Sequence, residues 1–189
     1  FFCSCVSKKE LLYFQDIQDY NKSEVISSTN ILQENDILKI DVTSLIMDAS
    51  IPYNKVSLVN NLGNSLQLLQ LNGYLVSSKE TINFPILGEV SVAGKTTTDL
   101  EIYLKKLLKS DGHLISPNVT VRLLNSKVTI LGEVKNPGTF TFTEKNISLL
   151  QALGLAGDLT IDGNRKNVII IRESNGVRTT SNLDLTSAS

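Results

Sequence analysis

The chain has 189 residues, of which 41% are hydrophobic and 20% are charged, and this allows one moderate core or two small ones. A formal net charge of −1 provides no overall basic field for nucleic acid or for an anionic membrane surface, so we expect no nucleic-acid partner. The sequence has no run of 18 apolar residues, which excludes a membrane-spanning helix within it.

Both cysteines stand at the start of the sequence, in the run Phe1-Phe2-Cys3-Ser4-Cys5. Apolar residues followed by small residues and a Cys are typical of a signal segment that leads into a lipoprotein processing site. Cys5, which follows the small Ser4, is the predicted site of lipidation, and Cys3 is the less favoured candidate. The alternatives are a Cys3–Cys5 disulfide, which has poor geometry at a separation of two residues, and a terminus that is simply disordered.

The first part of the chain is polar and then becomes strand-like. Residues 6–30 carry one short apolar patch, at residues 11–14, and are interpreted as a tether or a docked arm. Leu38, Ile40 and Val42 alternate with polar residues and predict a half-buried strand after a turn at Asn35-Asp36. The stretch around Pro52 gives no assignable pattern, and residues 61–75 are predicted to form a loop and then a strand.

The segment from residue 81 to residue 123 has the clearest pattern. Residues 82–90 predict one strand, with Pro85 on an edge or at a strand end because proline cannot donate to a ladder. Residues 96–99 offer N-caps for an amphipathic helix, and residues 119–123 alternate as another strand. The apolar residues of the helix recur at helical spacing: Leu100, Tyr103, Leu104, Leu107 and Leu108. The lysines late in the helix suit its dipole and need no ligand to explain them.

The sequence Ile-Leu-Gly-Glu-Val occurs twice, at residues 86–90 and 130–134. Each copy leads through a turn glycine, Gly94 or Gly138, toward a leucine-rich helix. The second helix is expected at residues 147–153, ended by Gly154 and Gly157, and a buried strand at 168–172 turns back at Asn175-Gly176. Because the order strand, turn, strand and helix follows both copies, we interpret it as a repeated supersecondary unit.

These residues carry a family resemblance. Residues 83–90, 92–96 and 116–121 resemble the polysaccharide export domain of the outer-membrane polysaccharide export proteins. Residues 128–140 and 149–157 are similar to the soluble-ligand-binding β-grasp (SLBB) module that follows it in that family. Residues 32–42 resemble the entry strand of the family, with Glu34-Asn35-Asp36 in place of Pro-Gly-Asp; Asn tolerates the left-handed conformation that Gly would adopt. The turn at residues 77–80 lacks the usual Gly, and we expect a looser hairpin there.

The resemblance implies an α+β fold with three parts. Residues 1–30 form a lipoprotein N-terminus and tether, residues 31–125 a small export domain of mixed sheet plus helix, and residues 126–189 a ubiquitin-like β-grasp module that lacks its C-terminal end. The Cys near the start and the compact two-module body are similar to lipoproteins of Bacteroidetes-type envelopes.

The resemblance also implies a function. The expected role is a component of a capsular or exopolysaccharide export channel, lipid-anchored at the periplasmic face of the outer membrane. The expected partners are identical subunits in a ring, the exported polysaccharide, and an inner-membrane co-polymerase that often carries a tyrosine kinase. Because no amphipathic pore-forming helix follows in this sequence, we expect either a truncated chain or a separate outer-membrane pore protein.

The search for reactive chemistry gives no catalytic, cofactor or metal site. His113 has no second His and no Cys nearby for zinc. Glu89 and Glu133 stand at equivalent repeat positions but are expected to accept backbone amides at strand-to-turn corners and not to form a glycosidase pair. Four scattered basic residues are expected on a solvated face: Arg122, Arg165, Lys166 and Arg172. Two alternatives stay open, a glycan-binding envelope lipoprotein without a transport role and an enzyme that processes glycan; the absence of Trp argues against an aromatic sugar platform.

Overall fold

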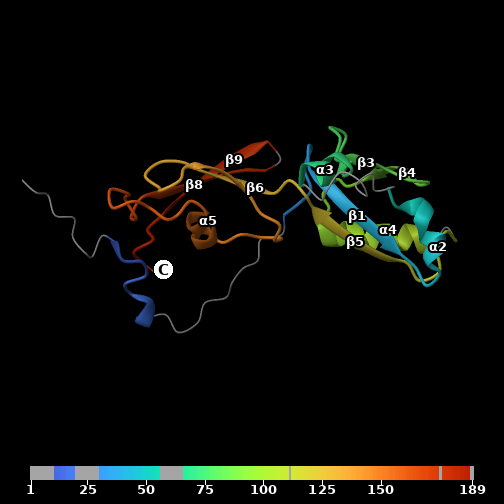
Figure 1. The fold of residues 1–189 in the computed structure, drawn as a ribbon, viewed down its shortest axis with the longest axis horizontal. Helices are drawn as coiled ribbons and strands as arrows, with labels where there is room; N and C mark the ends of the chain where they lie inside the picture. The colour runs from blue at the N-terminus through green and yellow to red at the C-terminus, as the bar shows by residue number, and fades with distance from the viewer. Residues whose placement is uncertain (1–10, 20–29, 56–65, 111, 175, 188–189) are drawn as a thin grey trace, which may run out of the picture. The chain divides into compact units, whose positions relative to one another are not determined.

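The computed structural model describes residues 11–19, 30–55, 66–110, 112–174 and 176–187 and separates into two compact units (Figure 1). The helix-on-sheet unit comprises the described residues from 30 to 126 together with Thr143–Lys145. The two-hairpin unit comprises residues 127–142 and 146–187 and also the N-terminal residues 11–19. Cys3 and Cys5 lie outside the described residues. The fold class is α+β, as predicted.

A three-stranded antiparallel sheet forms the base of the helix-on-sheet unit. Its order is β2 (Tyr74–Leu75), β1 (Ile37–Thr43) and β5 (Asn118–Leu123). In β1, Leu38, Ile40 and Val42 are buried and the residues between them are exposed, which confirms the predicted alternation. The register pairs Ile40 with Val121 and Val42 with Val119, so the buried side chains of both strands share one face.

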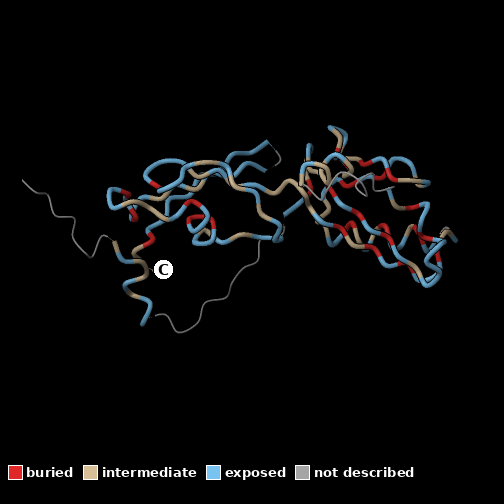
Figure 2. The backbone as a smooth tube through the Cα atoms, viewed as in Figure 1, coloured by how far each residue is buried: buried red, intermediate tan, exposed pale blue. Residues whose placement is uncertain are grey.

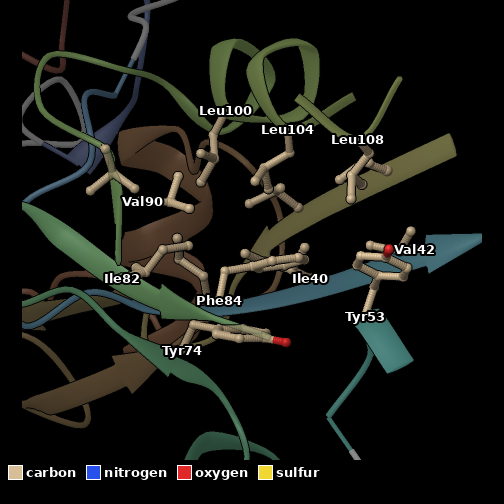
Figure 3. Close-up of a cluster of buried hydrophobic side chains, with 14 of the residues drawn as sticks. Ile40, Val42, Tyr53, Tyr74, Ile82, Phe84, Val90, Leu100, Leu104 and Leu108 are labelled. Atoms are coloured by element: carbon tan, nitrogen blue, oxygen red, sulfur yellow. The ribbon is translucent and has the colours of Figure 1, made fainter. Parts of the chain in front are cut away.

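Helix α4 (Thr97–Ser110) covers the buried face of this sheet. Leu100, Leu104 and Leu108 have no exposed area and point from α4 toward Ile40 and Val42 (Figure 3). The helix begins where the sequence predicts, because Thr96 Oγ1 accepts a hydrogen bond from the Asp99 amide at 3.1 Å. At the outer edge of the sheet, the Glu101 carboxylate accepts the Val121 amide at 2.8 Å, so α4 also satisfies an unpaired group of β5.

The predicted single strand over residues 82–90 is wrong, because the chain folds there into a hairpin. Strand β3 (Thr81–Phe84) pairs antiparallel with β4 (Gly88–Ser91), and Pro85 ends β3. The reversal requires positive φ angles of 67° at Ile86 and 71° at Gly88. A β-branched residue rarely adopts such a conformation, so the sequence pattern gave no sign of the turn. Phe84 stacks on Tyr74 with ring centroids 5.5 Å apart, which ties the hairpin to the sheet (Figure 3).

Two turns in this unit place other residues where glycine is usual. Asn35 has φ of 68°, which confirms the interpretation that Asn replaces a left-handed Gly before β1. Glu80 has φ of 54° in the turn that was expected to be loose. That expectation is wrong: the Ser77 amide donates to the Thr81 carbonyl at 2.9 Å, and the two hydroxyls lie 2.8 Å apart.

The segments without a clear sequence pattern form short helices. The stretch around Pro52 contains α2 (Met47–Ser50) and the 3-10 turn η2 (Ile51–Tyr53). Residues Leu66–Leu71, predicted as loop and strand, form α3, and the strand β2 follows only at Tyr74. A short run of leucines fits both helix and strand, so periodicity alone does not decide it.

Among its described residues, the two-hairpin unit contains one α-helix, the 3-10 turn η1 (Ile17–Asp19) and two separate strand pairs. Strand β6 (Lys127–Ile130) pairs with β7 (Gly138–Thr141), and β8 (Val168–Ser174) pairs with β9 (Val177–Leu183). Helix α5 (Leu149–Leu155) begins at a capping box in which Ser148 and Gln151 bond reciprocally. The expected end at Gly154 is wrong, since this residue is helical, and Gly157 with φ of 78° follows the helix.

The core of the two-hairpin unit is small. Its buried residues are Val134, Leu153, Ala156 and Leu185, with Tyr13 from the N-terminal segment packed against them. Figure 2 shows how much of the β8–β9 hairpin is exposed. The prediction that β8 is buried is wrong, because Ile169 and Ile171 are 58% and 62% exposed.

The repeated pentapeptide occupies two different structural positions. Ile86 lies in the β3–β4 turn, whereas Ile130 ends strand β6. Both copies nevertheless keep a left-handed glycine, Gly88 or Gly132, and end in a buried valine. The order strand, turn, strand and helix does occur twice, in β3, β4, α4 and in β6, β7, α5.

Candidate interaction surfaces

His113 has a structural partner in Tyr53. Its Nδ1 lies 3.0 Å from the Tyr53 hydroxyl, and the two rings meet edge to face. Over the part of the chain that the structure describes, no three His, Cys, Asp or Glu side chains gather closely enough to hold a metal ion. The Tyr53 contact joins the loop before β5 to the turn η2.

The two repeat carboxylates belong to different units and bond to threonine. Glu89 Oε1 accepts the Thr81 hydroxyl at 2.8 Å within the β3–β4 hairpin. Glu133 Oε2 accepts the Thr160 hydroxyl at 3.3 Å, and the Glu133 carbonyl accepts the Thr160 amide at 2.9 Å. The expectation that these carboxylates accept backbone amides is therefore wrong, although both fasten a strand or turn locally.

The expectation of a solvated basic face is wrong for Arg165. This side chain is only 5% exposed, and its guanidinium donates to three backbone carbonyls, of Leu159, Thr160 and Gly163, at 3.1–3.3 Å. Sequence reasoning missed it because the acceptors belong to a loop whose shape the pattern does not reveal. Lys166, Arg172 and Arg122 are exposed, as expected.

Arg122 belongs to a polar face on the side of the three-stranded sheet that α4 leaves open. Alternation places this face opposite the core, and its side chains are exposed or half-exposed. The polar face consists of Lys39, Asp41, Thr43, Asn118, Thr120 and Arg122. Lys39 and Asp41 form an ion pair at 3.1 Å, so the face carries both charges and several short hydrogen-bonding groups.

An apolar patch lies at the end of the same sheet, where β1 ends and β5 begins. Its side chains are 59–81% exposed: Leu45, Ile46, Met47, Ile51 and Ile115. The Asn54 side chain fixes the segment that follows β1, residues 44–54, to that strand. Its amide oxygen accepts a hydrogen bond from the Val42 amide, and its amide nitrogen donates to the Val42 carbonyl, both at 2.8 Å. The run Leu45-Ile46-Met47 immediately after a strand was the available sequence signal.

Comparison with known proteins assigns both units. A family model described as polysaccharide biosynthesis/export protein matches residues 25–124, and an SLBB domain model matches residues 127–180. The chain belongs to the polysaccharide biosynthesis/export family. The export match falls on the helix-on-sheet unit and the SLBB match on the two-hairpin unit, as the resemblance predicted.

Two curated relatives have export functions in their names. The chain is 32% identical over 107 residues to the EPS I polysaccharide export outer membrane protein EpsA of Ralstonia nicotianae, covering 54% of this chain and 27% of the relative. It is 29% identical over 123 residues to the capsule polysaccharide export outer membrane protein CtrA of Neisseria meningitidis, covering 64% of this chain and 31% of the relative. The matched regions thus span less than a third of either relative. Among the described helices of this export-family chain, none combines the length and the apolar character that crossing a membrane requires.

Proposed function

We propose that this chain is a non-enzymatic component of a polysaccharide export apparatus at the outer membrane. The observation that carries the proposal is the tandem of an export-family match and an SLBB match on two successive folded units. The relatives EpsA and CtrA, named as polysaccharide export outer membrane proteins, support the same role. Glu89, Glu133 and His113 each have a structural partner, which is consistent with a role in binding and guiding a polymer.

The polar face is suited to a polymer that must move. A hydrated polysaccharide chain slides only where individual contacts are weak, because deep and tight sites would retain it. The polar face offers hydroxyl, amide and paired charged groups on a regular sheet and exposes them to solvent. We assign to it the contact with the exported polymer.

The apolar patch supports subunit contact in a ring. Closed rings of identical subunits require two different faces of each subunit to meet. Exposed apolar clusters on folded domains mark interaction sites. The hydrogen bonds from Asn54 to Val42 hold residues 44–54, which carry most of the patch, in one conformation. We assign the patch to one side of the subunit contact in a homo-oligomeric ring.

The remaining parts of the proposal concern attachment and partners. Lipidation of Cys5, or less favourably Cys3, would hold the chain at the periplasmic face of the outer membrane. The apparatus would include an inner-membrane co-polymerase. Metabolic labelling with a fatty-acid analogue tests the anchor: we expect label in the wild type and in Cys3→Ser and none in Cys5→Ser, and label retained in Cys5→Ser would contradict the assignment.

Deletion of the gene in its native bacterium tests the role itself. We expect polysaccharide to be lost from the cell surface and retained inside the envelope, with the wild-type gene restoring it. Surface polysaccharide that is unchanged would contradict an export role. A changed polymer length or composition with normal export would favour a glycan-processing activity instead.

A further inference from the structure

The N-terminal arm, defined as residues 11–19, is docked on the rest of the two-hairpin unit. Its central contact joins Tyr13 to Asp158, which stand 145 positions apart in the sequence. The Tyr13 hydroxyl donates a hydrogen bond to Asp158 Oδ1. The Tyr13 ring lies under the Arg165 guanidinium, with 5.3 Å from its carbon to the ring centroid. Arg165 and Asp158 are 3.8 Å apart, so the three side chains, here named the clip, contact one another pairwise.

The receiving side of the clip is held in place by its own unit. Arg165 is fixed by its three carbonyl acceptors. Asp158 is held at φ of 72°, with its amide on the Leu153 carbonyl at 2.9 Å. The carboxylate also accepts the Leu159 amide at 2.7 Å. Since these bonds do not involve the arm, the Tyr13 site is formed by the SLBB-matched residues themselves.

The backbone of the arm is hydrogen-bonded to the C-terminal residues, in addition to the contacts of the Tyr13 side chain. The Phe14 amide donates to the Leu185 carbonyl at 3.1 Å, and the Gln15 amide to the Thr186 carbonyl at 2.8 Å. The Ser187 hydroxyl donates to Asp16 at 2.6 Å. Leu185 is itself buried and bonded through its amide to the Arg165 carbonyl at 2.8 Å, so clip and backbone contacts form one continuous site.

The position of the clip relative to the candidate anchor gives it a role. Tyr13 stands eight positions after Cys5, and even a fully extended chain spans only about 28 Å over eight residue steps. We infer that the clip ties the anchored N-terminus to the two-hairpin unit, so that this SLBB-matched unit is the part held against the membrane surface. The inference rests on the proposed attachment at Cys5, and it assigns to the clip the contact between the attached N-terminus and the folded unit.

Docking of the arm is tested first without any membrane. Hydrogen exchange of the Phe14 and Gln15 amides is measured in the soluble full chain for wild type, Tyr13→Ala and Asp158→Asn. We expect at least tenfold faster exchange in Tyr13→Ala and a smaller acceleration in Asp158→Asn, which keeps the left-handed backbone tolerable. Leu12→Ala, at a position 57% exposed in the same arm, is the matched control and should leave these amides unchanged.

Folding of the variants is followed on the same samples by exchange of the α5 amides. If Tyr13→Ala also accelerates exchange of the α5 amides, the test relies on Tyr13→Phe and Asp158→Asn, because each of these variants keeps a side chain of similar size. Exchange at Phe14 and Gln15 that is unaffected by all three variants would overturn the clip. This outcome is independent of lipidation and therefore separable from failure of the proposed anchor.

The membrane consequence is tested by attaching Cys5 to vesicles directly. A Cys3→Ser chain is coupled through Cys5 to maleimide lipid in phosphatidylcholine vesicles, with a donor dye on a non-natural azide side chain at position 180 of the exposed strand β9 and acceptor dye on headgroups. We expect efficient energy transfer with the native arm and with Leu12→Ala, and a loss of at least half of it with Tyr13→Ala. Equal transfer in all three would overturn the inference.

Discussion

Arg165 shows how a charged residue becomes part of a small core. Burial of a guanidinium is unfavourable unless its donors are used. The two terminal nitrogens of Arg165 donate to three carbonyls, and the Asp158 carboxylate and the Tyr13 ring lie beside the group, while the buried Nε has no hydrogen-bond partner among the described residues. The loop of residues 159–165 therefore folds around the side chain. Neither the loop nor the ring partner is visible in local sequence, because Tyr13 is far away along the chain.

Replacing Arg165 by Met should destabilise the two-hairpin unit by about 1–3 kcal/mol, because carbonyls arranged around its guanidinium lose their donor. The free energy of opening is measured from exchange of the α5 amides. Lys166→Met, at the exposed neighbouring position, is the control and should change it by less than about 0.5 kcal/mol. Equal values for the two variants would contradict the structural role of Arg165.

Tyr13 makes arm docking sensitive to alkaline pH. Partial burial, then the hydrogen bond and charge of Asp158, raise the pKa of Tyr13 from 10.0 to about 12, while Arg165 acts in the opposite direction. The neutral phenol is thus the form that docks. Docking should be complete below pH 10 and lost as the pH rises through 12. Tyr13→Phe should remove this dependence on pH, because phenylalanine does not titrate. Arm mobility is followed with a spin label at position 12 between pH 8 and 12.5 in both proteins. Identical pH profiles of the wild type and Tyr13→Phe would contradict the prediction.

At the scale of elements, helix α4 is the part of the molecule for which the sequence pattern and the structure agree most closely. Its capping residues, its apolar spacing and its contact with an alternating strand all agree. Leu104→Ala should destabilise the helix-on-sheet unit by about 2–5 kcal/mol, since this side chain has no exposed area. Ile102→Ala on the same helix, 63% exposed, should cost far less. Urea unfolding followed by circular dichroism compares them, and similar costs would mean that α4 does not pack as described.

The same physical reasons separate the elements that sequence predicts from those it does not. Strand β1 and helix α4 were predicted because one periodic face of each is buried. The β3–β4 hairpin was missed because Ile86 takes a conformation that β-branched residues avoid. The four successive aliphatic residues of β8 suit a core and predict a buried strand, whereas in the structure Ile169 and Ile171 face solvent.

The candidate surfaces were less predictable than the fold. The polar face follows from strand alternation in β1 and β5 once their pairing is known, and pairing is a long-range property. The apolar patch depends on residues 45–51, which follow β1, and on Ile115 before β5, and neither segment has a periodic pattern. The docked arm was one of two interpretations of residues 6–30, and its contacts with Asp158 and Leu185 required the folded chain.

At the scale of the whole molecule, subunit association should depend on the apolar patch. Met47→Glu places a charge in the proposed contact and should lower the oligomer fraction of the lipid-attached chain at least fivefold in light scattering. Ile102→Glu is the matched control, because Ile102 is an exposed apolar residue on α4 outside the patch, at 63% against 81% for Met47. If both variants lower the oligomer fraction equally, or if neither lowers it, the patch is not part of the subunit contact.

The central claim is that this chain guides a polysaccharide during export. It is tested most directly by placing a photoreactive side chain at position 41 on the polar face, illuminating the native bacterium during synthesis, and probing the purified chain for attached polysaccharide. A control position, 102, lies on α4. We predict attached polymer at position 41 and little at 102; attachment at neither position, with export proceeding normally, would contradict the account.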